Sequence, residues 1–245
     1  MQEKGILRGL LRRMLFIPSG TCPVCGRILI RTSAHLCDFC APTLPIIQMK
    51  DCRCCGRPVL SEGSPFCEAC ADSEERCFSG GAVWLNYSGS ARKLIAALKF
   101  GKKPILGHWI GEQMAKTVAE KTWMTELEGV VPVPLHPERQ LERGYNQSTF
   151  LAEGIGKTLH LPVIDGALVR YRDTPHQLGL DREARMKNLS GAFVVKEDQK
   201  IVGRKLLLVD DVITTGSTLK ECALTLLAAG AQSVYVTAAA AAPGN

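Results

Sequence analysis

Eight of the eleven cysteines in this 245-residue chain follow one spacing that occurs twice. The first set is Cys22, Cys25, Cys37 and Cys40, and the second is Cys52, Cys55, Cys67 and Cys70. Both sets read Cys-x2-Cys-x11-Cys-x2-Cys, and a Gly-Arg pair follows the second cysteine of each. Four thiolates at this spacing are typical of a closed structural zinc site, because a catalytic zinc keeps one position for water. The repeat therefore predicts two structural Zn²⁺ ions in a small unit duplicated in tandem.

The cysteines also indicate whether the protein is secreted or cytoplasmic. A disulfide framework is the alternative to zinc, but it belongs to secreted chains. Residues 1–20 contain no apolar core followed by a small-residue cleavage site. No window approaches eighteen uninterrupted apolar residues. We therefore expect a cytoplasmic protein without a transmembrane segment. Within the second set, Cys54 lies next to Cys55 and is an alternative ligand to it.

A different chemistry is indicated where an apolar run at residues 206–209 leads into Asp210 and Asp211. A turn around Gly216 follows, and its hydroxyl side chains are Thr214, Thr215, Ser217 and Thr218. At the carboxyl end of a parallel strand, a ligand can meet both carboxylates and the N–H groups of a starting helix. This arrangement suits a sugar phosphate, because the turn can hold the phosphate while the acids bind ribose hydroxyls or Mg²⁺. The alternative is that the two aspartates only cap the turn.

Residues 209–218, Val-Asp-Asp-Val-Ile-Thr-Thr-Gly-Ser-Thr, resemble the phosphoribosyl diphosphate (PRPP) signature of type I phosphoribosyltransferases. Further stretches resemble the ComF family of competence-related proteins, whose N-terminus is also rich in cysteine. They are residues 131–137, 143–147 and 174–177, with the spaced Arg182, Arg185, Asn188 and Phe193. The resemblance covers most of residues 20–240. It implies a type I phosphoribosyltransferase fold, a parallel sheet flanked by helices, with an N-terminal double zinc ribbon and a role in DNA uptake during natural transformation.

The resemblance also implies roles for individual residues. Asp210 and Asp211 would be the catalytic pair that holds the ribose hydroxyls and influences Mg²⁺. The 5′-phosphate would bind to Thr214, Thr215, Gly216, Ser217 and Thr218. The diphosphate needs cations, and the candidates are Lys99, Arg139, Arg143, Arg182 and Arg185. For each of these cations a surface salt bridge is the alternative. The implied reaction displaces diphosphate from C1 of PRPP, with an acceptor that these residues do not reveal.

The overall charge does not identify a partner. The formal charge is +6, but eight thiolates and two Zn²⁺ ions would change it by −8 and +4, which leaves about +2. The family resemblance adds single-stranded DNA and a protein of the competence machinery, such as a helicase, as candidate partners. Two other functions stay open, a non-catalytic PRPP sensor and a competence protein that handles single-stranded DNA.

The aspartates and the turn must be positioned by a folded domain. Strand and helix patterns alternate along the sequence, which predicts an α/β domain. We expect strands at residues 82–87, 130–135, 206–209 and 233–241. We expect helices at residues 90–100, 106–121, 146–159 and 217–229, and shorter extended pieces near residues 162–169 and 192–195. The last strand, helix and strand read as a parallel crossover.

Two domains are expected, because a segment of about fifty residues cannot bury enough surface without metal. Residues 1–77 would form an amphipathic helix, at residues 1–17, and the double zinc ribbon. Residues 78–245 would form the phosphoribosyltransferase domain. We expect the helix to pack against a neighbouring domain rather than lie on a membrane. Residues 170–188 are predicted to be a lid that closes over PRPP, with an ordinary exposed loop as the alternative.

Overall fold

The computed structural model describes residues 20–29, 35–61, 63–73, 76–101, 103–171 and 191–242. The chain divides into two compact units, Met1–Leu44 and Pro45–Asn245, which are described separately. The second cysteine set belongs to the larger unit, together with the sheet. The division into domains at residue 77 stays a prediction. The predicted helix at residues 1–17 lies outside the described residues, as does nearly all of the predicted lid.

The smaller unit contains the first cysteine set. The Cys22 N–H donates to the Arg27 carbonyl oxygen at 2.7 Å, and the Gly26 N–H donates to the Cys22 carbonyl oxygen at 2.9 Å. These bonds close a tight turn between the first two thiols. Gly26 has a φ of 77°, a left-handed conformation that glycine adopts without steric cost. The short helix η1 (Ala41–Thr43) follows the last cysteine of the set.

The second cysteine set has the same local structure within the larger unit. The Cys52 N–H donates to the Arg57 carbonyl oxygen at 2.7 Å, and the Gly56 N–H donates to the Cys52 carbonyl oxygen at 2.9 Å. Gly56 has a φ of 74°. The short helix α2 (Glu68–Ala71) begins directly after the third cysteine, Cys67. Equivalent hydrogen bonds at equivalent positions make the two sets copies of one structural unit.

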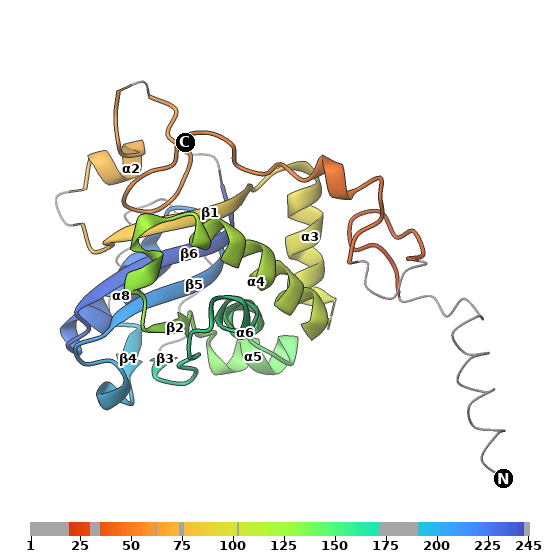
Figure 1. Ribbon diagram of the computed structural model, residues 1–245. Coiled ribbons are helices and arrows are strands. Elements are labelled where there is room, and N and C mark those ends of the chain that lie inside the picture. The colour runs from red at the N-terminus through yellow and green to blue at the C-terminus, as the bar shows by residue number, and fades with distance from the viewer. Residues whose placement is uncertain are drawn as a thin grey trace, which may run out of the picture. The chain divides into compact units, whose positions relative to one another are not determined.

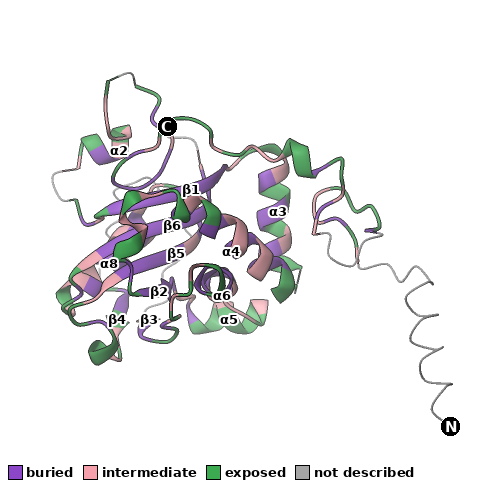
Figure 2. Ribbon diagram, in the orientation of Figure 1, coloured by how far each residue is buried: buried purple, intermediate pink, exposed green. Residues whose placement is uncertain are grey.

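The larger unit is built on a four-stranded parallel sheet with the strand order β1-β6-β5-β2 (Figure 1). The strands are β1 (Gly80–Asn86), β2 (Gly129–Pro132), β5 (Lys205–Ile213) and β6 (Ser233–Ala241). Strands β5 and β6 are buried along most of their length (Figure 2). Such burial is typical of central parallel strands that are covered on both faces. A parallel bridge between Val130 and Val163 continues the sheet beyond β2.

Helices cover both faces of this sheet. They are α3 (Gly89–Phe100), α4 (Pro104–Ala119), α5 (Pro137–Arg143), α6 (Gln147–Leu159) and α8 (Ser217–Ala228). Helices α4 and α6 pack on each other and on the sheet, and α3 packs on α4. Leu206 and Leu208 of β5 share a buried cluster with Leu219 and Cys222 of α8. Because side chains alternate along a strand, Leu207 points to the opposite face.

The remaining described elements are short. Strands β3 (Leu168–Arg170) and β4 (Phe193–Val195) form an antiparallel pair, and α8 packs against β4. The helices η2 (Thr122–Glu126) and η3 (Asp198–Lys200) are single 3₁₀ turns. None of the described helices is both long enough and apolar enough to cross a membrane. The predicted fold class, a parallel sheet flanked by helices behind an N-terminal double zinc ribbon, is confirmed.

The bounds of β1 differ from the expected ones by one or two residues, whereas two other strands end at least three residues from the expected position. Strand β5 does not stop before Asp210 but continues to Ile213, because β6 keeps pairing with it as far as Ala241. Strand β2 ends at Pro132 rather than at residue 135. Proline has no N–H to donate to a neighbouring strand, and the chain leaves the sheet one residue later.

Helix α5 was not predicted from the sequence. Its signals are nevertheless present, since Pro137 occupies a first-turn position and Gly144 follows the last helical residue with a φ of 82°. Proline at the start and glycine after the end are the usual pair of helix boundaries. The segment is only about two turns long and carries no clear apolar stripe, so periodicity alone did not reveal it.

The second cysteine set is packed backbone to backbone against β1. A Cβ atom added to Gly81 would lie 2.2 Å from the Cys55 carbonyl carbon, and one added to Gly56 would lie 2.4 Å from the Ala82 nitrogen. An ion pair between Lys121 and Asp51 joins the same set to the segment after α4. The second set is thus a fixed part of the larger unit.

Replacing Gly56 with alanine tests this contact, and Gly26 provides the matched control. Both substitutions place a side chain at a positive φ, which costs about 1–2 kcal/mol. Only Gly56→Ala also collides with β1, whereas a Cβ on Gly26 meets nothing within 4 Å. We expect scanning calorimetry to show the sheet unit of Gly56→Ala melting roughly 5 °C lower. Gly26→Ala should leave that transition in place, and equal shifts in the two variants would contradict the contact.

Candidate functional site

The candidate site lies where β2 and β5 separate. The last hydrogen bond between their backbones runs from the Val133 N–H to the Val209 carbonyl oxygen, at 2.9 Å. Beyond it β2 turns away toward α5, while β5 continues through Asp210 and Asp211, paired with β6 alone. A crevice at the carboxyl end of parallel strands, where neighbouring connections diverge, is the usual ligand site of such sheets. The two aspartates are the first residues of β5 that lie past this separation.

Asp211 is buried and both of its carboxylate oxygens are engaged. The Lys99 ammonium lies 2.9 Å from Oδ1, and the Gln147 Nε2 donates to Oδ2 at 2.6 Å. Burial by itself lowers the pKa of Lys99, but the charge of Asp211 outweighs it, so the pKa is raised and the ammonium stays charged. Lys99 and Gln147 together hold the Asp211 carboxylate in one orientation.

Asp210 has a different environment. Its Oδ1 accepts hydrogen bonds from the Asp211 N–H at 2.8 Å and from the Ser148 hydroxyl at 3.4 Å. Burial and then repulsion from Asp211 raise the pKa of Asp210 to about 7. Near neutral pH this carboxyl can therefore take up or release a proton, or bind a cation or a sugar hydroxyl.

The turn after β5 brings the predicted phosphate-binding residues together at the start of α8. Gly216 has a φ of 83°, which reverses the chain into the helix. The Ser217 N–H donates to the Thr215 hydroxyl at 3.3 Å, and the hydroxyls of these two residues lie 2.8 Å apart. Thr214 is exposed and Thr218 is half-buried. The first turn of a helix has N–H groups without helical partners, and these suit an anion.

The predicted cations divide into three groups. Lys99 contacts Asp211 directly, and the Arg143 Nη1 donates to Gln147 Oε1 at 3.0 Å, so Arg143 reaches Asp211 through Gln147. Arg139 lies half-buried on α5 and makes no hydrogen bond or ion pair with the described part of the chain. The remaining candidates, Arg182 and Arg185, lie outside the described residues.

Gln147 and Ser148 were not among the predicted site residues, although both contact an aspartate. Asn146 places them, because its side chain accepts from the Ser148 N–H at 3.1 Å and donates to the Val133 carbonyl oxygen at 3.0 Å. Asn146 thus caps α6 and holds the first turn of that helix against the end of β2. An asparagine before a helical run is a recognisable start signal, so the position of this turn could have been anticipated.

The two cysteine sets form compact groups that fit structural zinc. In each, the four Sγ atoms lie within 4.8 Å of one another, as tetrahedral coordination by thiolates requires. Cys55, not Cys54, belongs to the second group. The Cys54 thiol instead donates to the Phe78 carbonyl oxygen at 3.7 Å. Four protein thiolates leave no position for water, so these sites suit folding rather than catalysis.

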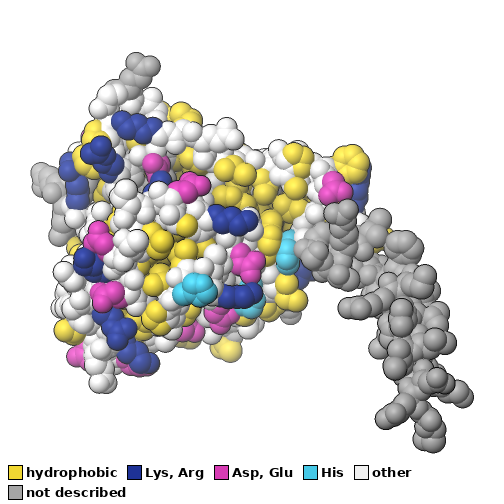
Figure 3. Space-filling view, in the orientation of Figure 1, with side chains coloured by type: hydrophobic (Ala, Val, Ile, Leu, Met, Phe, Trp, Pro, Cys, Tyr) yellow, Lys and Arg dark blue, Asp and Glu magenta, His cyan; other side chains and the backbone are white. Residues whose placement is uncertain are grey.

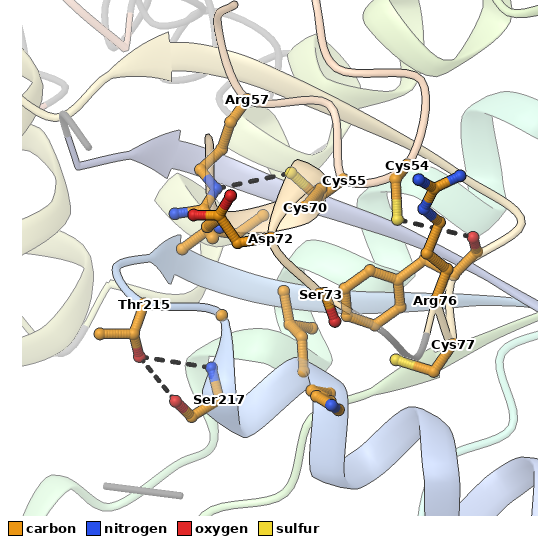
Figure 4. A pocket seen from close by; sticks show the side chains of 16 residues that line it. Cys54, Cys55, Arg57, Cys70, Asp72, Ser73, Arg76, Cys77, Thr215 and Ser217 are labelled. Atoms are coloured by element: carbon orange, nitrogen blue, oxygen red, sulfur yellow. Dashed lines mark hydrogen bonds between the residues drawn. The ribbon is translucent and has the colours of Figure 1, made fainter. Parts of the chain in front are cut away.

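A cavity of about 580 Å³ lies between the second cysteine set and the turn at residues 214–217 (Figure 4). Its cations are Arg57, Arg76 and Lys220. Arg57 is buried, its Nε donates to Cys55 Sγ at 3.4 Å and its Nη1 donates to the Thr214 carbonyl oxygen at 2.8 Å. Sequence reasoning missed Arg57 as a site residue, and only the repeated Cys-Gly-Arg triplet drew attention to it.

Comparison with known proteins identifies a matching domain family and related proteins. Residues 11–71 match the family model of the double zinc ribbon domain. The chain is 35% identical over 136 residues to competence protein F of Haemophilus influenzae, covering 52% of this chain and 59% of that protein. It is 34% identical over 154 residues to the DNA utilization protein YhgH of Escherichia coli K12, covering 62% of this chain and 67% of that protein. The chain belongs to the ComF family.

The match to these ComF relatives is partial, since the chain spans 59% of the length of the Haemophilus protein. Among solved structures, the chain is similar to a glutamine PRPP amidotransferase from B. subtilis, at 19% identity and a TM-score of 0.39. That likeness covers 58% of this chain and 30% of the amidotransferase. A similarity of this degree leaves the function of this ComF protein to be argued from its own residues.

The pKa of Asp210 predicts how stability depends on pH. The carboxyl binds its proton with a pKa of about 7 in the folded state and about 3.9 in the unfolded state. The folded state therefore holds more protons between these values, and the free energy of unfolding falls as pH rises. The asparagine variant has no carboxyl to titrate at this position. We therefore expect the free energy of unfolding of Asp210→Asn, relative to that of the parent, to rise by roughly 2 kcal/mol between pH 5.5 and 7.

Urea denaturation at several pH values measures this difference. The matched control is Glu120→Gln, which makes the same change from acid to amide at an exposed position. The control should keep the pH dependence of the parent protein. If the free energy of unfolding changes equally with pH in Asp210→Asn and in the parent, the Asp210 carboxyl does not titrate in this range.

Proposed function

We propose that this ComF protein binds PRPP and transfers its phosphoribosyl group to an acceptor. The observation that carries the proposal is the open edge of β5, where Asp210 and Asp211 are followed directly by the glycine turn that starts α8. One ligand can reach both features only if it carries a hydroxyl-bearing ring next to a phosphate. PRPP has this combination, and free phosphate would make no use of the acids.

The roles follow from the contacts of each group. The 5′-phosphate would be held by residues 214–218, where backbone N–H groups and hydroxyls converge. The ribose hydroxyls would bind to Asp210, because Asp211 already has Lys99 and Gln147 as partners. Asp211 would then act mainly by orienting Lys99 and by keeping a negative charge beside Asp210.

Mg²⁺ fits this donor set as a ligand of the substrate rather than as a fixed part of the protein. Mg²⁺ prefers oxygen ligands and is commonly bound by one or two carboxylates together with substrate phosphates. Asp210 is the carboxylate that remains for it, since both oxygens of Asp211 are engaged. The ion would neutralise charge on the leaving diphosphate.

The cations of the site would stabilise the departing diphosphate. Lys99 lies beside the acids, Arg143 is linked to them through Gln147, and Arg139 lies on the same short helix as Arg143. The bond from C1 of the ribose to the diphosphate breaks as the acceptor bonds to C1. Positive charge develops on the ring, and the adjacent carboxylates stabilise it without a covalent intermediate on the protein.

Calorimetry with PRPP in the presence and absence of Mg²⁺ tests the binding step. The zinc-loaded parent should bind PRPP, and Asp210→Asn should bind it at least tenfold more weakly, because a charged hydrogen-bond acceptor is lost. Glu120→Gln is the control and should bind as the parent does. Since Asp210→Asn is expected to fold stably near neutral pH, a loss of binding would not reflect unfolding.

Release of diphosphate on addition of bases, amines or nucleic acids tests the transfer step. Release that requires PRPP and an acceptor supports a transferase. Saturable PRPP binding with no release by any acceptor would instead support a non-catalytic sensor. Absence of PRPP binding by the parent would contradict both functions.

Binding of single-stranded DNA is a second candidate function. The relatives carry the names competence protein and DNA utilization protein. On the face seen in Figure 3, Lys and Arg side chains are interspersed with Asp and Glu. The cavity by contrast gathers Arg57, Arg76 and Lys220, and the Arg76 guanidinium stacks 4.1 Å from the Phe66 ring centroid. Cations next to an aromatic ring suit the phosphates and bases of a single strand.

Fluorescence titration with a labelled oligonucleotide over a range of salt concentrations tests this second function. We expect the logarithm of affinity to fall linearly with the logarithm of salt concentration. Arg76→Ala should reduce that slope by about 0.7, the value for one phosphate contact on a single strand. Lys93→Ala on the exposed side of α3 is the control and should keep the slope. Equal slopes in all three proteins would remove Arg76 from any DNA-binding surface.

A further inference from the structure

The two cysteine sets place the same arginine in different surroundings. Arg27 and Arg57 occupy equivalent positions, each directly after the glycine of its Cys-Gly-Arg triplet. Arg27 is exposed, and its guanidinium stacks 4.2 Å from the ring centroid of Phe39. Arg57 is only 7% exposed, and its recorded contacts within the described residues are hydrogen bonds to Cys55 and Thr214. The two arginines thus occupy equivalent positions in the repeat but contact different groups.

One further difference between the repeats explains the change. The position equivalent to Phe39 is Ala69, so the second repeat has no ring at this position. Ala69 instead lines the cavity beside the turn after β5. The missing ring thus leaves both an open space and a guanidinium that must find other acceptors, because a buried arginine without partners is strongly destabilising.

Arg57 finds these acceptors on two segments that are far apart in the sequence. Its Nε donates to Cys55 Sγ at 3.4 Å, and its Nη1 donates to the Thr214 carbonyl oxygen at 2.8 Å. Thr214 is the first residue of the turn that leads into α8. One side chain thus joins a thiol of the second set to the backbone of the proposed phosphate site. Figure 4 shows the first of these two bonds, from Arg57 to Cys55.

The geometry is suited to hold the turn in place. The second set is fixed to β1 by the contact of Gly56 with Gly81 and by the Lys121–Asp51 ion pair. Four thiolates around one Zn²⁺ carry a net charge of about −2, which attracts a guanidinium. Arg57 therefore extends from a rigid, negatively charged base. Its planar group with several donors can hold two acceptors in a fixed relation, which a lysine cannot do.

We propose that Arg57 is a positioning residue that orders the turn at residues 214–218 by tying it to the second cysteine set. Arg27, at the equivalent position of the first set, stacks on Phe39 within its own unit and serves as the matched control. The effect on PRPP affinity rests on the proposed function of the site. The ordering of the turn does not, and it can be measured without any ligand.

Hydrogen exchange followed by mass spectrometry tests the ordering of the turn in the full, zinc-loaded chain. We expect the peptide that contains residues 214–218 to exchange at least fivefold faster in Arg57→Ala than in the parent protein, because local opening becomes easier. Arg27→Ala, the matched control at the equivalent position, should exchange at the parent rate in this peptide. Unchanged exchange in Arg57→Ala would overturn the proposal.

Calorimetry with Mg²⁺-PRPP on the same proteins separates this inference from the proposed function. We expect Arg57→Ala to bind about tenfold more weakly than the parent, and Arg27→Ala to bind equally well. If the parent binds PRPP and Arg57→Ala neither loosens the turn nor weakens binding, the inference fails and the function stands. If the parent does not bind PRPP while Arg57→Ala still loosens the turn, the function fails and the positioning role stands.

A second variant guards against loss of folding. Arg57→Lys keeps the positive charge beside the thiolates, but its single ammonium cannot reproduce the two directed bonds of the guanidinium. Circular dichroism establishes that the variant is folded. The turn should then exchange faster than in the parent and more slowly than in Arg57→Ala. Parent-like exchange in a folded Arg57→Lys would mean that charge alone orders the turn, and it would contradict a role that depends on the planar guanidinium.

Discussion

The arrangement of the larger unit depends on the unpaired edge of β5. Strand β2 makes its last backbone bond to β5 at Val209 and then leaves the sheet, whereas β6 holds β5 in place to Ile213. Two carboxylates are therefore carried on a rigid strand with one side open. The first turn of α6 and the end of α3 lie beside this edge, and their polar groups Gln147, Ser148 and Lys99 contact Asp210 and Asp211.

Adjacent aspartates acquire different properties at this edge because their partners differ. Both carboxylate oxygens of Asp211 have partners, Lys99 and Gln147. Asp210 accepts from the Ser148 hydroxyl and the Asp211 N–H within the described part of the chain, and burial and the neighbouring Asp211 raise its pKa to about 7. Two neighbouring carboxylates repel each other, and burial adds to this effect in raising the pKa of Asp210. The acid with fewer partners is the one that a ligand or a cation can use.

The double ribbon illustrates how one small unit supports two roles. Both copies keep the hydrogen bonds that close the metal-binding turn, so the fit to zinc is retained in each. The residues that face outward from the turn are free to change. Ala69 in place of a ring, together with the close contact of Gly56 with β1, places the second copy beside the turn after β5. The second cysteine set and the turn after β5 are thereby joined through Arg57.

By itself, the sequence determined the features that depend on neighbouring residues: the two cysteine sets, the β5-turn-α8 segment and most helix and strand positions. Spacing and periodicity encode these because their contacts are local. The tertiary structure alone decided that β5 continues past Asp210, that Lys99 and Gln147 share Asp211, and that Arg57 reaches Thr214. Each of these contacts joins segments that are distant in the sequence, and their meeting depends on how the whole sheet and its helices pack, which no local pattern specifies.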